Sequence, residues 1–413
     1  SKSIDVVEKT DVSSTVQEIL TKVRKSGDLA LREYTEQFDK VIPESWLVPE
    51  SALEEALDNL EDDLFLVLQQ AADNIMLFHE RQKTDSQLDF SSDGSVLGWK
   101  VTPVDSAGIY IPGGRAAYPS TLLMNAIPAQ IAEVPRIAVV SPPGPSGFPH
   151  PLVMATAAFM GLEELYAVGG AQSIAALAYG TESIEKVVKI TGPGNAYVAE
   201  AKRQVFGKVG IDSLAGPSEI MIVCDRQDIP VDYLVRDMLS QAEHDPDAGA
   251  FLVTTSEKQA KKVADSLKKL VPKLPRREII EASFKNRSAI ILVKNMEEIF
   301  EVVNELAPEH LEVLTKEPFD DLYRIRNAGA IFLGPNTPEP VGDYFAGPNH
   351  TLPTSGCAKF SSPLGVQDFV KTSSVISYST ERLQSQGEQI IRFAEEEELF
   401  SHAAAIQARL DNL

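Results

Sequence analysis

The feature that most restricts the fold is an alternation, from residue 104 onward, of short apolar runs with amphipathic stretches of helical period. The first apolar runs predict buried strands at residues 107–111, 137–141, 165–169 and 187–191. Helical patterns lie between them at residues 121–132, 152–160 and 174–179. Because buried strands joined through helices pair in parallel and need helices on both faces, this segment predicts a doubly wound α/β lobe.

The same texture returns in the second half of the chain, without any residue-level repeat of the first. Strands are predicted at residues 220–224, 251–254, 289–293, 311–314 and 330–333. Helices are predicted at residues 231–242, 259–270 and 296–306. The fold class is therefore α/β, with two doubly wound, incomplete Rossmann-like lobes that meet near Ala215 and Gly216.

Helical patterns flank the two lobes. Val16, Ile19, Leu20 and Val23 share one face of a helix that Ser13 or Ser14 could cap, residues 53–78 form a second helical pattern, and residues 380–410 form the last. We expect four parts: a helical segment (1–103), a first lobe (104–215), a second lobe (216–370), and a helical tail (371–413).

Charge and cysteine content limit the partners. The 60 acidic residues against 38 basic ones give a net charge of −22, which argues against nucleic acid and anionic membrane surfaces. No apolar run reaches the roughly 18 residues that span a bilayer, and the first 30 residues do not resemble a signal peptide. Cys224 and Cys357 are too few for a disulfide framework, so we expect a reducing compartment: the cytoplasm, or an organelle stroma if a transit segment was removed.

Glycine-rich turns follow three strands of the first lobe, at Gly113-Gly114, Gly169-Gly170 and Gly192-Pro193-Gly194. Glycine permits close backbone approach, and a helix that starts after such a turn offers free N–H groups to a phosphate. The turns therefore suggest a dinucleotide site, although glycines also end strands for structural reasons alone. The chain has neither a Rossmann G-x-G-x-x-G after a strand nor a P-loop, so this pattern indicates only a nucleotide or phosphate ligand.

Polar residues gather in the second half of the chain. Gln241 and His244, three apart at a helix end, could form half of a metal site, or His244 could simply cap the helix. Glu309 and His310, before an apolar strand, are candidates for acid–base work, or could belong to a charged loop. Asp343 and His350 lie in a loop rich in Gly and Pro, and Glu397 and His402 lie on the terminal helix.

Taken together, these segments resemble the histidinol dehydrogenase family over nearly the whole chain. The motifs that carry the resemblance lie at residues 23–28, 34–39, 110–114, 192–195, 215–219, 241–244, 307–310 and 342–350. The resemblance implies two successive NAD-dependent oxidations, from L-histidinol through L-histidinal to L-histidine, as the last steps of histidine biosynthesis. It also implies a homodimer in which the tail of one subunit contributes to the active site of the other.

The resemblance further implies roles for individual residues. Zinc would be held by Gln241, His244, Asp343 and His402, and the acid–base pair would be Glu309 and His310. The substrate would contact the zinc ligands and also Ser218, His310, His350 and Glu397. The cofactor NAD would contact Tyr110, Gln172 and Asn195.

These roles are chemically consistent. A mixed nitrogen and oxygen ligand set suits zinc, which would orient an amino alcohol that carries an imidazole. His310, whose ordinary pKa lies near neutrality, would take the hydroxyl proton, and Glu309 would activate water for the second oxidation.

Three alternatives remain open at this point. A related dehydrogenase of a sulfonated propanediol would conflict with Glu397, since a carboxylate repels a sulfonate. A non-enzymatic, zinc-stabilised nucleotide sensor would leave Glu309 and His310 without a task. A thiohemiacetal on Cys357 would need a lowered thiol pKa, and only Lys359 lies near in sequence to provide it.

Overall fold

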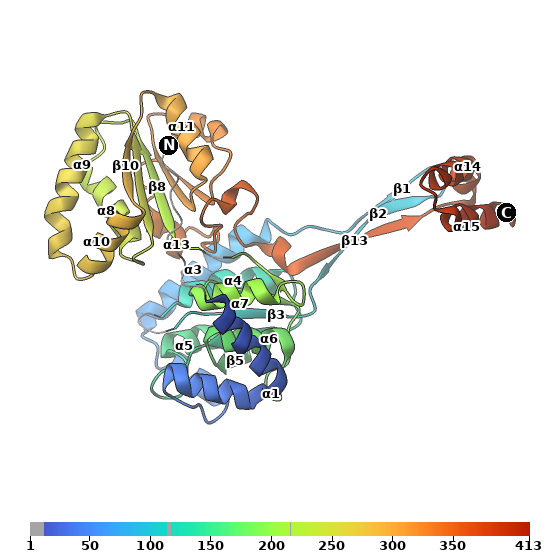
Figure 1. The fold of residues 1–413 in the computed structure, drawn as a ribbon, viewed down its shortest axis with the longest axis horizontal. Coiled ribbons are helices and arrows are strands. Elements are labelled where there is room, and N and C mark those ends of the chain that lie inside the picture. The colour runs from blue at the N-terminus through green and yellow to red at the C-terminus, as the bar shows by residue number, and fades with distance from the viewer. Residues whose placement is uncertain (1–11, 114–116, 215) are drawn as a thin grey trace. The chain divides into compact units, whose positions relative to one another are not determined.

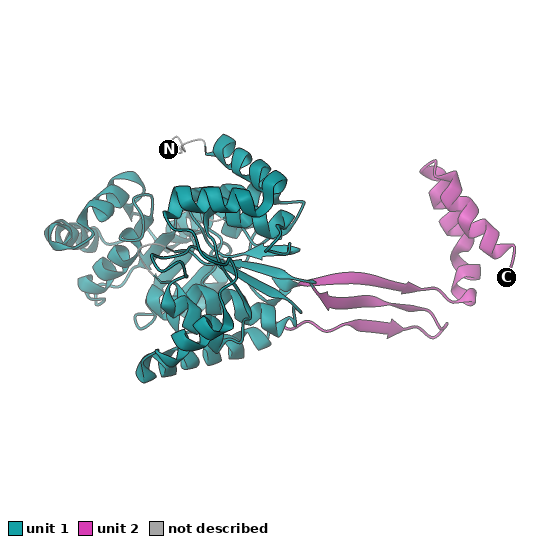
Figure 2. Cartoon of the chain, turned by 90° about the horizontal axis from the view of Figure 1, so that it is seen from below, with its two compact units in different colours: residues 1–82, 104–369 teal, residues 83–103, 370–413 magenta. Residues whose placement is uncertain are grey.

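The computed structural model describes residues 12–113, 117–214 and 216–413. The chain divides into two compact units: Ser1–Gln82 with Val104–Phe369, and Lys83–Pro103 with Val370–Leu413 (Figure 2). This division cuts the chain differently from the four expected parts, because residues 83–103 pair with the tail segment. Within the described residues, no helix is both long and apolar enough to cross a membrane.

The first lobe of the large unit is built on a five-stranded parallel sheet. Its strands are β3 (Ala107–Tyr110), β4 (Ile137–Ser141), β5 (Glu164–Ala167), β6 (Lys189–Thr191) and β7 (Gly210–Ile211), in the order β5-β4-β3-β6-β7. All four predicted strands are confirmed, and β7 is an addition. The chain runs outward from β3 to one edge and then returns to the other edge through β6, so the order reverses between β3 and β6.

Helices bury both faces of this sheet. They are α1 (Ser13–Asp39), α2 (Glu50–Asp58), α3 (Asp62–Glu80), α4 (Pro119–Ile131), α5 (Pro151–Phe159), α6 (Gly170–Tyr179) and α7 (Ala196–Val205). Along β4, Ala138 and Val140 face the cluster that contains α1, α6 and α7, whereas Val139 faces α2, α4 and α5. The N-terminal helices therefore belong to the core of the lobe. The predicted serine cap of α1 is wrong, because Val12 occupies the N-cap position.

The second lobe repeats the strand order of the first. Its strands are β8 (Glu219–Cys224), β9 (Gly249–Thr254), β10 (Ala289–Leu292), β11 (His310–Leu314) and β12 (Ala330–Leu333), in the order β10-β9-β8-β11-β12. All five predicted strands are confirmed. Helices α8 (Val231–Ala242), α9 (Glu257–Leu270) and α10 (Arg277–Asn286) cover one face, and α11 (Met296–Leu306) covers the other (Figure 1).

Short elements complete the large unit. The α-helices are α12 (Pro318–Asp321) and α13 (Glu339–Tyr344), and the 3-10 turns are Val271–Lys273, Leu322–Arg324, Cys357–Lys359 and Val366–Phe369. Helix α13 matters for the site, because it carries Asp343, which the sequence analysis placed in a loop.

The small unit is an antiparallel sheet followed by two helices. Its strands β1 (Gln87–Phe90), β2 (Val96–Pro103) and β13 (Val370–Ser377) lie in the order β1-β2-β13. Helices α14 (Thr380–Glu396) and α15 (Phe400–Leu410) replace the single predicted terminal helix, because the backbone turns left-handed at Glu398 (φ 60°). Arg382 of α14 pairs with Asp93 of the β1–β2 turn at 2.7 Å, which ties the helices to the sheet.

Candidate active site

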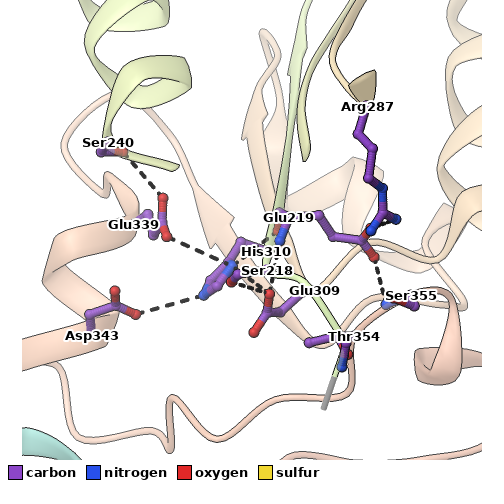
Figure 3. A network of polar contacts seen from close by, with 11 residues as sticks. Ser218, Glu219, Ser240, Arg287, Glu309, His310, Glu339, Asp343, Thr354 and Ser355 are labelled. Atoms are coloured by element: carbon purple, nitrogen blue, oxygen red, sulfur yellow. Dashed lines mark hydrogen bonds and ion pairs between the residues drawn. The ribbon is translucent and has the colours of Figure 1, made fainter. Parts of the chain in front are cut away.

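The amino ends of β8 and β11 lie side by side and bring the predicted acid–base pair together with residues near Ser218 (Figure 3). The parallel register sets His310 opposite Ile220. Helix α11 ends at Ala307, whose left-handed backbone (φ 50°) turns the chain before Glu309 enters the sheet. The confirmed strand thus places Glu309 and His310 at a buried sheet edge and not in a charged loop.

Glu309 is held by two donors from the start of β8. Its Oε2 accepts a hydrogen bond from the backbone N–H of Glu219 at 2.9 Å and another from the hydroxyl of Ser218. Burial raises the pKa of Glu309, while nearby His310 and these two donors oppose the rise. The side chain is therefore fixed in orientation and more basic than an exposed glutamate, which suits proton transfer.

His310 is buried among carboxylates. Its Nδ1 lies 3.1 Å from the carbonyl oxygen of Glu219, and because a carbonyl only accepts, Nδ1 carries the proton. Nε2 lies 3.7 Å from Oδ1 of Asp343 (Figure 3). Burial would lower the pKa of His310, but the surrounding carboxylates, led by Glu309 and Glu339, raise it to about 10. The expectation of a near-neutral pKa thus does not describe the ring in this arrangement.

Asp343 interacts electrostatically with three of the predicted histidines. Burial alone would raise the pKa of Asp343, but its interaction with His310 lowers it instead. The charges of His350 and His244 act in the same direction. Burial lowers the pKa of both His350 and His244, so both favour the neutral form that binds metal ions. Four sequence-predicted residues therefore share one electrostatic environment.

Glu339 also belongs to this site, and the sequence analysis missed it. Its Oε1 lies 3.8 Å from Nδ1 of His310, and its Oε2 accepts from the Ser240 hydroxyl at 3.3 Å. Burial raises the pKa of Glu339 to about 7. The ligand atoms of His310, Glu339 and Asp343 all lie within 4.8 Å of one another. Glu339 and Asp343 are four residues apart, a spacing that places two side chains on one face of a helix. This signal was missed because the segment that contains Asp343 was predicted to be a loop.

Gln241 supplies the strongest sign that a group binds here. It lies in the last turn of α8 with 0% of its surface exposed, and neither its Oε1 nor its Nε2 has a partner in the described structure. A buried amide without partners costs roughly 1–3 kcal/mol, so this side chain is explained best by a ligand. Together with the carboxylate of Asp343 and the neutral histidines, an amide oxygen makes a donor set that fits zinc.

The remaining predicted residues fall in two places. Glu397 directly follows α14 and His402 lies on α15, so both belong to the small unit, where both are exposed. Cys357 lies in a 3-10 turn of the large unit, and burial together with the charge of Glu219 raises its pKa. A raised pKa disfavours the thiolate, which argues against Cys357 as a nucleophile.

The predicted cofactor residues lie at the carboxyl edge of the first sheet. The Tyr110 hydroxyl accepts a hydrogen bond from the backbone N–H of Gly170 at 3.3 Å. Gln172 is buried in α6 and its Oε1 has no partner within the described residues. Asn195 caps α7 by accepting from the N–H groups of Tyr197 and Val198 at 3.0 and 3.1 Å. Gly114, from the first predicted turn, lies outside the described residues.

The turn after β6 is held in a strained conformation by a buried ion pair. Gly192 has φ +108°, and an added Cβ would lie 2.2 Å from the Tyr110 carbonyl oxygen. Asp212 accepts from the Gly192 N–H at 2.8 Å, Lys202 donates to the Gly192 carbonyl at 2.9 Å, and the two side chains pair with each other. This clamp fixes the backbone where the strand order reverses, which is where ligands bind in doubly wound sheets.

Comparisons with known proteins point to a single family. A family model described as histidinol dehydrogenase matches residues 3–410. The chain is 52% identical over 395 residues to the histidinol dehydrogenase of Bacillus subtilis, covering 96% of this chain and 92% of that protein. It is also 52% identical to that of Halalkalibacterium halodurans over 397 residues, covering 96% and 93%. A crystal structure of histidinol dehydrogenase from Elizabethkingia anophelis is 35% identical, with a TM-score of 0.94 over 98% of this chain and 94% of that one.

Proposed function

The chain belongs to the histidinol dehydrogenase family and is an NAD-dependent oxidoreductase that oxidises histidinol in histidine biosynthesis; from this premise we propose how its residues perform the two oxidations, to L-histidinal and then to L-histidine. The observation that carries the proposal is the cluster of Glu309, His310 and Asp343, together with the buried, partnerless amide of Gln241 on α8. A bound group would explain the unpaired amide of Gln241, and acid–base catalysis would explain the buried pair of Glu309 and His310.

Gln241, His244 and Asp343 would hold a zinc ion within the large unit, with His402 as a fourth ligand. When bound, zinc supplies an electrophilic centre that orients the amine and imidazole nitrogens of the substrate. A cation beside Asp343 also offsets part of the carboxylate charge that raises the pKa of His310. Purified protein should contain about one zinc per chain, as expected of a catalytic site, and full turnover of metal-free protein would refute this assignment.

In the first oxidation, His310 accepts the hydroxyl proton at Nε2. Its Nδ1–H is engaged by the carbonyl of Glu219, which fixes the tautomer and leaves Nε2 as the basic atom. The hydride leaves the carbinol carbon for the nicotinamide ring of NAD.

In the second oxidation, Glu309 takes a proton from the water that adds to the aldehyde. The donors from Ser218 and Glu219 both act on Oε2, and none of the hydrogen bonds found among the described residues engages Oε1. Oε1 is therefore the atom available to the water, and hydride passes to a second NAD. Ser218 in this proposal orients Glu309 as well as contacting the substrate.

We further propose a homodimer in which the small unit serves the partner's site. Support comes from the small unit itself: Glu397 and His402 are exposed, and so are Phe393 (70%) and Phe400 (66%) on the same helices. Exposed aromatic side chains are typical of interaction surfaces. His402 would complete the zinc ligands, and the Glu397 carboxylate would bind the cationic amine of the substrate.

Complementation tests the shared site. His402→Ala and His244→Ala are each expected to be inactive. If the tail acts in the partner's site, mixed dimers carry both lesions in one site and none in the other, so co-refolding should restore about a quarter of wild-type activity. An inactive mixture that contains verified heterodimers would rule out the exchange.

A turnover assay tests the whole proposal. Zinc-loaded protein should reduce two NAD for each histidinol. Turnover of a sulfonated propanediol instead would favour the related dehydrogenase, which Glu397 argues against. Binding of NAD without any turnover would favour a nucleotide sensor, which leaves Glu309 and His310 unexplained. The two free cysteines, Cys224 and Cys357, suit a reducing compartment such as the cytoplasm.

A further inference from the structure

Asp39 is a carboxylate that the fold does not explain. It is the last residue of α1 and closes the motif at residues 34–39. Its Oδ2 is shielded from solvent and has no hydrogen-bond partner within the described residues. Burial raises its pKa to about 6.

This placement is unfavourable in two separate ways. The carboxyl end of a helix carries partial negative charge, which repels a carboxylate. A buried carboxylate oxygen without a partner also loses its hydration without compensation. A residue that lowers the stability of the folded protein in this way is expected at a binding site, where a ligand supplies the missing contacts.

The surroundings of Asp39 indicate which ligand. Tyr110 belongs to the same buried cluster as Leu31 and Tyr34 of α1, the helix that ends at Asp39. Burial raises the pKa of Tyr110 to about 12, and the charge of Asp39 contributes to the rise. The Tyr110 hydroxyl is bonded to the N–H of Gly170. Oε1 of Gln172, also without a partner, lies 2.5 Å from the position of a Cβ added at Gly170. The region therefore presents two unused acceptors beside a turn at the carboxyl edge of the first sheet, and calls for a ligand with hydroxyl or amino donors.

The end of β4 explains why the carboxylate comes from α1. In dinucleotide-binding folds of this strand order, an acidic residue near the end of the second strand binds the hydroxyls of the adenosine ribose. Here β4 is followed by Pro142, Pro143 and Gly144. Pro142 also packs against the adjacent turn, since a Cβ added at Gly169 would lie 2.2 Å from its ring. No acid is available at that position, whereas Asp39 ends a helix that packs in one cluster with Tyr110, the last residue of β3.

We propose that Asp39 accepts hydrogen bonds from the adenosine ribose hydroxyls of NAD and, by its charge and position, excludes the 2′-phosphate of NADP. This inference rests on the proposed function, in that it assigns a residue to the cofactor of the same reaction. It makes Asp39 the residue that determines cofactor preference.

Asp39→Asn tests the proposal, because it removes the charge and keeps the size of the side chain. The probes are NADH and NADPH, titrated into zinc-loaded protein and followed by their fluorescence. NADH affinity should fall about 10- to 100-fold, the value of a hydrogen bond to a charged group, while NADPH affinity is unchanged or improved. The KM for histidinol should not change, and the melting temperature should stay the same or rise.

Glu36→Gln is the matched control, since Glu36 lies on the same helix, is exposed, and loses the same charge. It should leave both affinities as in the wild type. An unchanged preference for NADH in Asp39→Asn would overturn the proposal. Equal losses of NADH and NADPH binding with a lower melting temperature would also overturn it, by showing a structural role. Failure of the wild type to oxidise histidinol would instead refute the proposed function, which the binding titrations do not depend on.

Discussion

The two lobes share one strand order, but their proposed functional groups lie at opposite edges of the sheet. In the first lobe, Tyr110, Gln172 and the turn at Gly192 lie at the carboxyl edge, where doubly wound sheets usually bind ligands. In the second lobe, Glu309 and His310 lie at the amino edge of the strands. Strand order therefore predicts a nucleotide site only when the turns at the carboxyl edge can admit one.

The carboxyl edge of the second sheet is closed by its own side chains. Gln259 donates from Nε2 to the Arg226 carbonyl at 2.8 Å, and its Oε1 accepts from the Thr254 hydroxyl at 3.2 Å. No glycine follows β8, β9 or β11 there to let a phosphate approach the backbone. The two sites also differ in kind: the first depends on backbone turns, and the second on buried carboxylates and histidines.

Loss of the base in the second lobe should give the largest effect. His310→Ala is expected to slow the oxidation of histidinol roughly 10²- to 10⁴-fold, the usual loss for a positioned base. NADH affinity should not change, because we propose that the cofactor binds at the first lobe. Stopped-flow formation of NADH and an equilibrium titration measure the two quantities. A parallel fall in NADH affinity would break the separation between the lobes.

Glu309→Gln should separate the two oxidations, with a somewhat smaller effect. The aldehyde step needs an activated water and should slow about 100-fold, whereas the alcohol step should change much less. Single-turnover experiments started from histidinol and from histidinal provide the comparison. Equal losses on both substrates would contradict the assignment of the water to Glu309.

A change in the first lobe should act on stability and cofactor alone. Lys202→Met leaves Asp212 buried without its partner, and both side chains are nearly inaccessible, at 3% and 4% exposed. Breaking such a pair should lower the free energy of unfolding by roughly 3–5 kcal/mol and weaken NADH binding by loosening Gly192. Denaturant unfolding and elemental analysis check this, and a loss of zinc from the folded variant would count against it.

Cys357→Ala should have the smallest effect. Its pKa is raised, so the thiolate that a thiohemiacetal requires is scarce. Both oxidation steps should stay within a few fold of the wild type. A selective loss of the aldehyde step in this variant would revive the thiol mechanism.

The sequence predicts the core of this fold well and its periphery poorly. All nine predicted strands lie in the two lobes, where burial on both faces produces short apolar runs that are easy to recognise. Strands β1, β2 and β13 were missed, since β1 is exposed along its length and the small unit buries little. The break at Glu398 depends on a left-handed residue inside a continuous helical pattern, which periodicity does not reveal.

The site was predictable only in part, for similar reasons. Glu309 and His310 stand out as an adjacent pair before a strand, and the family resemblance indicates the other roles. Glu339 was missed because α13 is a single short helix, Glu339–Tyr344, within a segment rich in Gly and Pro. Asp39 looks like any acidic residue at a helix end, and only its shielded, partnerless Oδ2 and the packing of α1 with Tyr110 distinguish it.

A crystal structure of the protein with zinc and NADH would test the central claim, the division of work between opposite sheet edges, most directly. We predict that zinc binds beside Gln241 and Asp343, near the amino ends of β8 and β11. We predict that NADH binds at the carboxyl edge of the first sheet, beside Tyr110 and Gly192. NADH bound instead at the carboxyl edge of the second sheet, near Arg226 and Gln259, would contradict the account.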